Sequence, residues 1–471
     1  AIEQSSGPSH AGSRPARGPL LGRGAGYAVA FMRAGRAMAR RRAGGSRLAL
    51  AAAAAAICLN GLPWHGSAFT SAAVRACPAR LCRPAWSAGL RRLPEPLRAD
   101  PESASSTSDV PWVQLALAVV AAAAALIAAS FSSLFKPKEY MTAGSVVKRM
   151  DMDGGGRLKV TSHGISEQEG LADLPPGSVL EYRVLRFEPC DMYLQAVAKV
   201  CVAPPGSPEP RVRQLTEALT LPYNRSLAAV VLVTLAALGA PVLAAARAAP
   251  GRAGGSGEEG EELRILCIGL GCGSVPAFFA RLLPGCRVDV VESEPAVVRA
   301  AEEAMGLVTG PRLRVAVEDG AAFALRAAEE HGGQGAYDAL VIDAFDAEGN
   351  VPPAMWTSGG GVPEALARGL LRPQGLVAVN FLPRTAVAPR LATYSGAMAS
   401  GGGNPGLGFT VRAEEGNLMT VQTCGSFALA SEEVWGRDLA KAAQEVQEAT
   451  NCPFDLEELA TNRLQIWQQG T

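Results

Sequence analysis

From Leu263 to Phe381 the chain alternates short apolar runs with amphipathic segments of helical length. The apolar runs predict strands at Leu263–Ile268, Arg287–Val291, Leu313–Glu318, Ala339–Ile342 and Gly375–Phe381. The segments between them predict helices at Val275–Leu283, Pro295–Met305, Ala321–Glu330 and Pro363–Leu371. This alternation favours an α/β fold with a doubly wound parallel sheet, which binds ligands beyond the C-terminal ends of its strands.

Shorter patterns on either side extend this fold. Upstream, strands separated by Gly/Pro-rich turns predict a small β domain over residues 150–205, with strands at Leu158–Ser162, Val179–Phe187 and Met192–Val202. Residues 210–430 form the predicted catalytic domain, which ends in an edge hairpin of Phe409–Val411 and Leu418–Thr423. Residues 431–471 predict a C-terminal helical extension.

Two uncharged apolar runs raise the question of a membrane. The run within residues 111–136 is followed by Lys136 and Lys138 and is long enough to cross a bilayer, which needs about 20 residues. We expect it to be a transmembrane helix, with a removed targeting element or a buried helix as alternatives. Hydropathy alone also permits a span at Leu227–Ala246.

Charge divides the chain unevenly, although Lys+Arg and Asp+Glu are equal at 44 each. Residues 1–94 carry a net charge of +13, with 14 Arg and no Lys, and the remainder carries −13. Such a basic start predicts an address over residues 1–110, a signal plus transit peptide that we expect to be removed or disordered. No basic stripe with interleaved aromatics appears in the body, so nucleic-acid binding is not predicted.

The order of signals within this address favours a plastid. Arg40, Arg41 and Arg42 precede an apolar Leu48–Leu62 stretch, and small residues then stand before Phe69, as in the cleavage motif of proteins sent to complex algal plastids. An Arg-rich transit segment follows. A mitochondrial or secretory address remains the alternative.

The 10 cysteines are scattered without a CxxC motif, and only 4 histidines occur. This spacing predicts no metal site and favours buried or free thiols in a reducing compartment.

A glycine turn follows the first predicted strand, in the sequence I-L-C-I-G-L-G-C-G-S. Gly269, Gly271 and Gly273 let the backbone turn tightly, and the next helix N-terminus offers free N–H groups to a nucleoside-type cofactor. On its own this turn also fits a dinucleotide-binding dehydrogenase.

Acidic residues follow the next three predicted strands. Glu292 is placed to accept hydrogen bonds from a ribose diol, with a helix-terminal charge as the alternative. Asp319, followed by Gly320, is placed for an adenine amino group or for a simple helix cap. Asp343 and Asp346 lie where a nucleophile would react, and an acid there can deprotonate or orient an amine; turn chemistry is the alternative.

Taken together, these motifs resemble the class I S-adenosylmethionine-dependent transferases, and within them the spermidine-synthase-like branch. L-C-I-G-L-G-C-G-S-V-P, V-V-E-S-E-P-A-V-V, V-E-D-G-A-A-F and Y-D-A-L-V-I-D-A-F-D follow in that family's order and spacing. The ending V-A-V-N-F-L with L-M-T-V-Q-T resembles the C-terminal half of a eukaryotic elongation-factor methyltransferase. The resemblance also assigns Leu227–Ala246 to the helix that leads into the first strand, and not to a membrane span.

The resemblance implies a role for each motif residue. The glycine turn, including Cys272, would flank the amino-acid part of the cofactor, with Gln195 contributing from the small β domain. Glu292 would hold the ribose and Asp319–Gly320 the adenine. Asp343 would act near the attacking amine, with Asp346 as its partner.

Two departures from the polyamine synthases favour methyl transfer. Those enzymes carry Asp where this chain has Cys272, and an acid after the position of Tyr223, where Asn224 and Arg225 follow here. A neutral Cys272 removes the repulsion that an Asp would exert on the carboxylate of S-adenosylmethionine, about 1 kcal/mol or more. Arg225 would disfavour a cationic substrate if it faced the pocket.

We therefore predict a plastid, membrane-associated methyltransferase that uses S-adenosylmethionine and a small-molecule or protein amine. The protein could form a homodimer. An aminopropyltransferase using decarboxylated S-adenosylmethionine is the first alternative. The second is a non-catalytic subunit of a plastid membrane complex, because fold does not guarantee chemistry.

Overall fold

A computed structural model describes residues 138–166, 174–188, 194–249, 262–346, 349–425 and 431–467, all within one compact unit, Thr107–Thr471. The predicted address over residues 1–110 and the predicted membrane segment over 111–136 lie outside the described residues. Among the helices that the structure does describe, none combines the length and apolarity that crossing a membrane requires.

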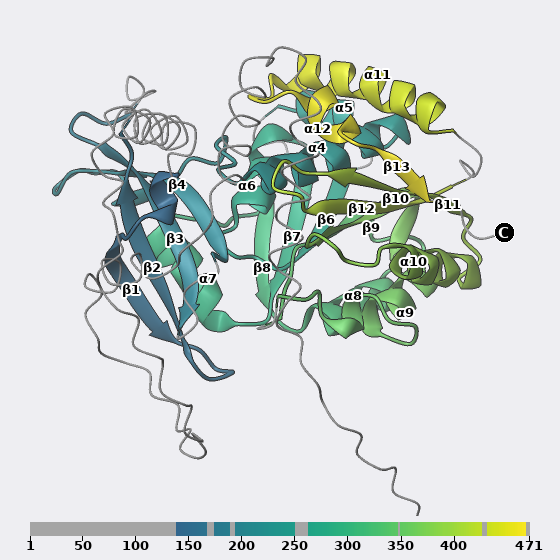
Figure 1. Cartoon of the computed structure of the whole chain (residues 1–471), viewed down its shortest axis with the longest axis horizontal. Coiled ribbons are helices and arrows are strands. Elements are labelled where there is room, and N and C mark those ends of the chain that lie inside the picture. The colour runs from purple at the N-terminus through teal and green to yellow at the C-terminus, as the bar shows by residue number, and fades with distance from the viewer. Residues whose placement is uncertain are drawn as a thin grey trace, which may run out of the picture. The chain divides into compact units, whose positions relative to one another are not determined.

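The larger sheet has eight strands in the order β13-β11-β12-β10-β9-β6-β7-β8 (Figure 1). The parallel strands are β6 (Leu263–Ile268), β7 (Cys286–Glu292), β8 (Leu313–Val317), β9 (Tyr337–Ile342) and β10 (Leu371–Phe381). Antiparallel strands β11 (Pro405–Arg412), β12 (Leu418–Cys424) and β13 (Gln465–Trp467) complete one edge. The predicted Rossmann-like α/β sheet is confirmed.

Helices cover both faces of this sheet (Figure 1). One face packs against α4 (Pro222–Ala237), α6 (Ser274–Leu282), α7 (Pro295–Met305), α11 (Glu432–Thr450) and α12 (Leu456–Thr461). The other face packs against α8 (Gly320–Glu330), α9 (Gly361–Ala367) and α10 (Ala388–Ser400). The resulting three layers leave the C-terminal strand ends open to one side.

The long apolar run after Tyr223 is part of this core. Helix α4 buries an unbroken series from Leu227 to Leu235, and the short helix α5 (Val242–Arg247) follows after a turn. Burial on every side explains why the helix is apolar all round. The run thus leads toward β6 as predicted, but it forms two helices and not one, because it turns between Ala237 and Val242.

The smaller sheet is antiparallel, with strands in the order β1-β2-β3-β4-β5. Its strands are β1 (Ser145–Asp151), β2 (Arg157–Gly164), β3 (Val179–Glu188), β4 (Ala196–Val202) and β5 (Val212–Gln214). A single turn of 3₁₀ helix, Glu139–Met141, precedes β1, and a second, Pro353–Met355, precedes α9. Ala196 and Leu185 join the same apolar cluster as α4 and β6, which ties the two sheets together.

Some predicted boundaries were wrong. Strand β10 begins at Leu371, four residues before the predicted Gly375, because Leu371 pairs with Tyr337 ahead of a register shift. The predicted helix Pro363–Leu371 accordingly ends earlier, at Ala367. The predicted C-terminal helical pattern gives way to β13, whose Gln465 pairs with Thr410 of β11.

Candidate active site

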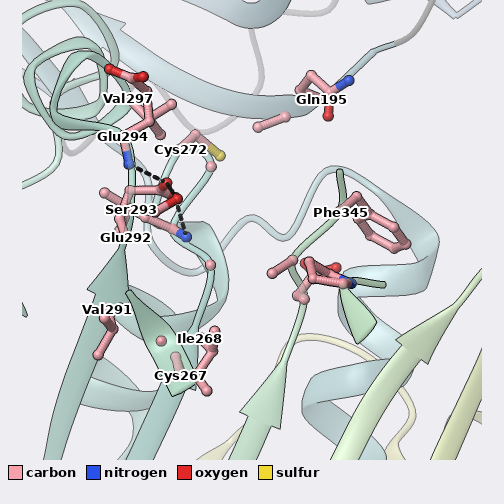
Figure 2. A pocket seen from close by; sticks show the side chains of 18 of the residues that line it. Gln195, Cys267, Ile268, Cys272, Val291, Glu292, Ser293, Glu294, Val297 and Phe345 are labelled. Carbon is pink, nitrogen blue, oxygen red and sulfur yellow. Dashed lines mark hydrogen bonds between the residues drawn. The ribbon is translucent and has the colours of Figure 1, made fainter. Parts of the chain in front are cut away.

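A cavity of about 460 Å³ lies at the C-terminal ends of β6, β7 and β9, beneath the start of β4. It is lined by nine of the ten predicted site residues: Gln195, Gly269, Gly271, Cys272, Glu292, Asp319, Gly320, Asp343 and Asp346. Figure 2 shows Gln195 across the cavity from Glu292, with Phe345 on a third side. Gly273 is the predicted residue that does not line it.

The glycine turn is required by contacts within the protein. Gly269 has a φ of 95°, and a Cβ there would lie 2.4 Å from the carbonyl oxygen of Asp343. Gly273, the N-cap of α6, has a φ of 75°, and a Cβ there would meet Leu307 at 2.8 Å. Glycine at position 269 therefore lets the turn after β6 contact the Asp343 loop, which the sequence alone did not reveal.

Cys272 lies in the same turn as a buried, neutral thiol. Its Sγ is 3.0 Å from the hydroxyl of Ser274, and its carbonyl accepts the side-chain amide of Gln214 at 3.0 Å. Burial raises the pKa of the Cys272 thiol, against the lowering effect of the Ser274 contact. The thiol is therefore uncharged near neutral pH, as the sequence argument required.

Glu292 is fixed by the backbone around it. One carboxylate oxygen accepts the N–H of Leu270 at 3.0 Å, and the other accepts that of Glu294 at 3.0 Å (Figure 2). A carboxylate offers about four lone-pair positions, so the same oxygens can still accept from a diol. The role of Glu292 in ribose binding stays a prediction, and these two hydrogen bonds hold its carboxylate in one orientation.

Glu294 has a role that the sequence did not reveal. Its carboxylate caps α7 by accepting the N–H of Ala296 at 3.0 Å. It also accepts the N–H of Asp153 at 3.1 Å, from the β1–β2 turn of the smaller sheet. Gly154 and Gly155 of that turn line the cavity, so Glu294 holds one wall in place.

Asp319 is the N-cap of α8, and its Oδ1 accepts the N–H of Ala322 at 2.9 Å. The capping alternative is thus present in the structure, while the adenine role stays a prediction. Gly320 packs closely on β6, since a Cβ there would lie 2.5 Å from the Ile268 side chain. Both residues border the cavity.

Asp343 has the most distinctive environment of the predicted acids. Its Oδ1 accepts the side-chain amide of Asn380 at 2.8 Å, and the Oδ1 of Asn380 accepts that of Asn417 at 3.0 Å. Burial raises the pKa of the Asp343 carboxyl, and the Asn380 hydrogen bond partly opposes that effect. A carboxylate with a raised pKa at a cavity wall is suited to accept a proton.

Asp346 takes part in a turn. Its Oδ1 accepts the N–H of Asn350 at 2.7 Å, and its own N–H donates to the carbonyl of Asn350 at 2.8 Å. The turn alternative is therefore observed. Its predicted partnership with Asp343 stays a prediction.

Tyr223 and Asn224, from the first turn of α4, also line the cavity. Burial raises the pKa of the Tyr223 hydroxyl far above its usual range, with a further contribution from Asp343. Asn224 is 5% exposed, and its Oδ1 has no hydrogen-bond partner among the described residues. A buried acceptor without a protein partner at a cavity wall is free to accept a hydrogen bond from a ligand or a water there.

Arg225 does not face the cavity. It is exposed, and its Nε donates to the carbonyl of Leu219 at 2.6 Å. The condition under which it would disfavour a cationic substrate is therefore not met. Among the described residues that line the cavity there are five carboxylates and no Lys, Arg or His.

Parts of the chain are similar in sequence to known proteins. No family model matches the chain. A polyamine aminopropyltransferase of Vibrio vulnificus is 40% identical over 85 residues, 18% of this chain and 27% of that protein. The eEF1A lysine and N-terminal methyltransferase of Bos taurus is 28% identical over 127 residues, 26% of this chain and 18% of that protein.

Two solved structures are also similar. Human methyltransferase-like protein 13 in complex with SAH has 21% identity and a TM-score of 0.38, over 50% of this chain and 94% of that one. A probable spermidine synthase of Corynebacterium glutamicum has 14% identity and a TM-score of 0.40, over 70% and 98%.

The two sequence relatives are transferases by their names, and the sheet with its strand-end acids has the arrangement that the motifs predicted. The chain is therefore similar to class I S-adenosylmethionine-dependent transferases, and within them to the spermidine-synthase-like branch, as its motifs predicted. The chain aligns with 27% of the length of the Vibrio vulnificus protein and with 18% of the length of the Bos taurus protein. By their names, the first transfers an aminopropyl group and the second a methyl group.

Proposed function

We propose that the protein is a methyltransferase that takes a methyl group from S-adenosylmethionine and transfers it to an amine. The observation that carries this proposal is the buried, neutral Cys272 in the glycine turn. An Asp at this position would repel the carboxylate of S-adenosylmethionine, and a protonated thiol does not.

The chain's residues fit this cofactor. Among the described residues, the cavity wall has five carboxylates and no cation, which suits a positively charged sulfonium. Asn224 Oδ1 is buried without a hydrogen-bond partner among the described residues, so it suits a donor on the cofactor, such as an ammonium group. In this proposal Glu292 accepts from ribose hydroxyls and Asp319 accepts from adenine.

S-adenosylmethionine held in this cavity would supply an electrophilic methyl group and would leave as S-adenosylhomocysteine when the bond from sulfur to that methyl group breaks. Asp343 accepts a proton from the amine, or orients its N–H so that the nitrogen lone pair faces the methyl group. Asn380 fixes the Asp343 carboxylate for that role. Holding both reactants in one cavity supplies most of the acceleration.

The acceptor that we propose is an amine on a protein. The support is the similarity to eEF1A lysine and N-terminal methyltransferases, one of which, from Xenopus laevis, is 33% identical over 96 residues. This similarity extends over 19% of this chain and 14% of that protein, so the acceptor remains part of the proposal.

We also propose the plastid address and the membrane segment, which a fluorescent fusion of residues 1–136 would test.

Calorimetry with the purified full chain tests which form of the cofactor the protein binds. We expect S-adenosylmethionine and S-adenosylhomocysteine to bind more tightly than decarboxylated S-adenosylmethionine. Tight binding of the decarboxylated form alone would favour aminopropyl transfer, which the 40% identical relative and the acidic cavity also support. Lack of binding by all three, with stoichiometric co-purification in a membrane complex, would favour the non-catalytic alternative.

A further inference from the structure

Two asparagine side chains connect Asp343 to the turn between β11 and β12. Asn380, near the end of β10, donates from Nδ2 to Asp343 Oδ1 at 2.8 Å. Asn417, just before β12, donates from Nδ2 to Asn380 Oδ1 at 3.0 Å. Each of the two hydrogen bonds joins residues that are 37 positions apart, so three separate segments converge on one carboxylate.

The acceptor-only carboxylate of an ionised Asp343 and the donating amide of Asn417 both favour this direction of the two hydrogen bonds. A primary amide has one accepting end and one donating end, which differ little in shape. Asn380 is fully buried, so its oxygen must find a donor inside the protein. Asn417 provides that donor, which leaves the Nδ2 of Asn380 directed at Asp343.

Without Asn417, the opposite orientation of Asn380 becomes favourable. Its oxygen would then face Asp343 Oδ1, and two acceptors cannot bond unless the carboxyl carries a proton. A donor to the carboxylate favours its charged form, and an acceptor beside it favours the protonated form. The identity of residue 417 therefore influences the protonation of a carboxyl that it does not touch.

We propose that Asn417 is a positioning residue, which keeps Asp343 ionised and oriented toward the cavity by fixing the amide of Asn380. The proposal rests on the proposed function in that Asp343 is the group that meets the amine. It adds a role for the β11–β12 turn, which no predicted site residue occupies. Asn417 itself is not among the residues that line the cavity.

The test is the titration of Asp343 in the full chain, followed by carbon NMR of selectively labelled aspartate carboxyls. The signal is assigned by its loss in Asp343→Asn. In Asn417→Ala and in the similarly sized Asn417→Leu, we expect the midpoint to rise by about one pH unit, as loss of a charge-assisted hydrogen bond implies. Asn417→Gln, which keeps an amide donor, should recover part of the shift.

Asn462 provides a matched control. Its Nδ2 donates to the carbonyl of Arg412 at 2.7 Å, at the other end of the same turn. Asn462→Ala should lower stability to a similar extent and leave the Asp343 midpoint unchanged. An unchanged midpoint in both Asn417→Ala and Asn417→Leu, or an equal shift in Asn462→Ala, would overturn the proposal.

This measurement needs no acceptor, so it is separate from the proposed function. If S-adenosylmethionine fails to bind while the midpoint shifts, the proposed function fails and the coupling from Asn417 to Asp343 stands. If the cofactor binds and the midpoint does not shift, Asn417 has only a structural role. A methyl-transfer assay, once an acceptor is found, should show the same shift in the acid limb of kcat/KM.

Discussion

The carboxylate of Glu294 accepts the backbone N–H of Asp153 at 3.1 Å, which links the start of α7 to the β1–β2 turn of the other sheet. The same carboxylate caps α7. One side chain therefore stabilises a helix and also fixes a turn whose Gly154 and Gly155 form part of the cavity wall.

Glu294→Ala should affect both stability and binding. Loss of the helix cap and of the cross-sheet bond lowers the free energy of unfolding by about 1–2 kcal/mol. Release of the turn should also weaken S-adenosylhomocysteine binding, measured by calorimetry. Asp455→Ala, which removes the corresponding cap of α12, should lower stability by about 1 kcal/mol without changing binding. Equal binding by the Glu294 variant would show that the link does not shape the cavity.

Local patterns predicted the elements that depend on local sequence. Strand β6 and helix α7 have the predicted bounds, because each has a complete apolar pattern and a clear turn or cap. Strand β13 could not be predicted, since its three residues form a strand only by pairing with β11. Strand boundaries that depend on a pairing partner distant in sequence can be determined only from the tertiary structure.

The same distinction applies to the site. Glycines and acids that follow strands are visible in sequence, and seven of them line one cavity together with Cys272 and Gln195. Asn380 and Asn417 were not predicted, because their importance comes from contacts across 37 positions each. Asn224 could be recognised only once its buried, unpartnered oxygen was located.

Gly269→Ala tests the close contact between β6 and the Asp343 loop. The new Cβ would overlap the Asp343 carbonyl, and a φ of 95° is unfavourable for alanine. We expect a loss of roughly 2 kcal/mol or more in thermal unfolding, with weaker cofactor binding. Gly396→Ala, in an exposed and open part of α10, should instead stabilise by about 0.5–1 kcal/mol.

Cys272→Asp tests the choice of cofactor. A carboxylate in the glycine turn should weaken S-adenosylmethionine at least tenfold, since like charges at close range cost more than about 1.4 kcal/mol at moderate dielectric. Binding of decarboxylated S-adenosylmethionine should change less or improve. Cys272→Ser, which is neutral and of similar size, serves as the control and should keep the wild-type preference. An unchanged ratio of the two affinities in Cys272→Asp would remove Cys272 as the basis for the methyl-transfer proposal.

Asn224→Leu tests whether the buried Asn224 oxygen meets a ligand donor. Removing this acceptor should weaken cofactor binding by about tenfold or more, while the free protein keeps or gains stability. Thr234→Val, on the same helix, is the matched control. Thr234 is fully buried, its hydroxyl has no hydrogen-bond partner among the described residues, and it does not line the cavity. The Thr234 variant should change stability alone, so a loss of affinity in both variants would indicate a general effect of α4.

Asp343→Asn should abolish transfer and yet stabilise the protein at alkaline pH. Burial holds the pKa of Asp343 above its value in the unfolded chain, so the folded state binds this proton more tightly. Stability is therefore lost as the pH rises from the unfolded pKa through the folded one, by about 1.4 kcal/mol for each unit of difference. The asparagine variant avoids that loss, and its oxygen can still accept from Asn380. Thermal unfolding should then show the variant above the wild type at pH 8, with the difference vanishing below about pH 4. A variant less stable than the wild type at pH 8 would mean that the ionised carboxylate stabilises the fold, contrary to its burial.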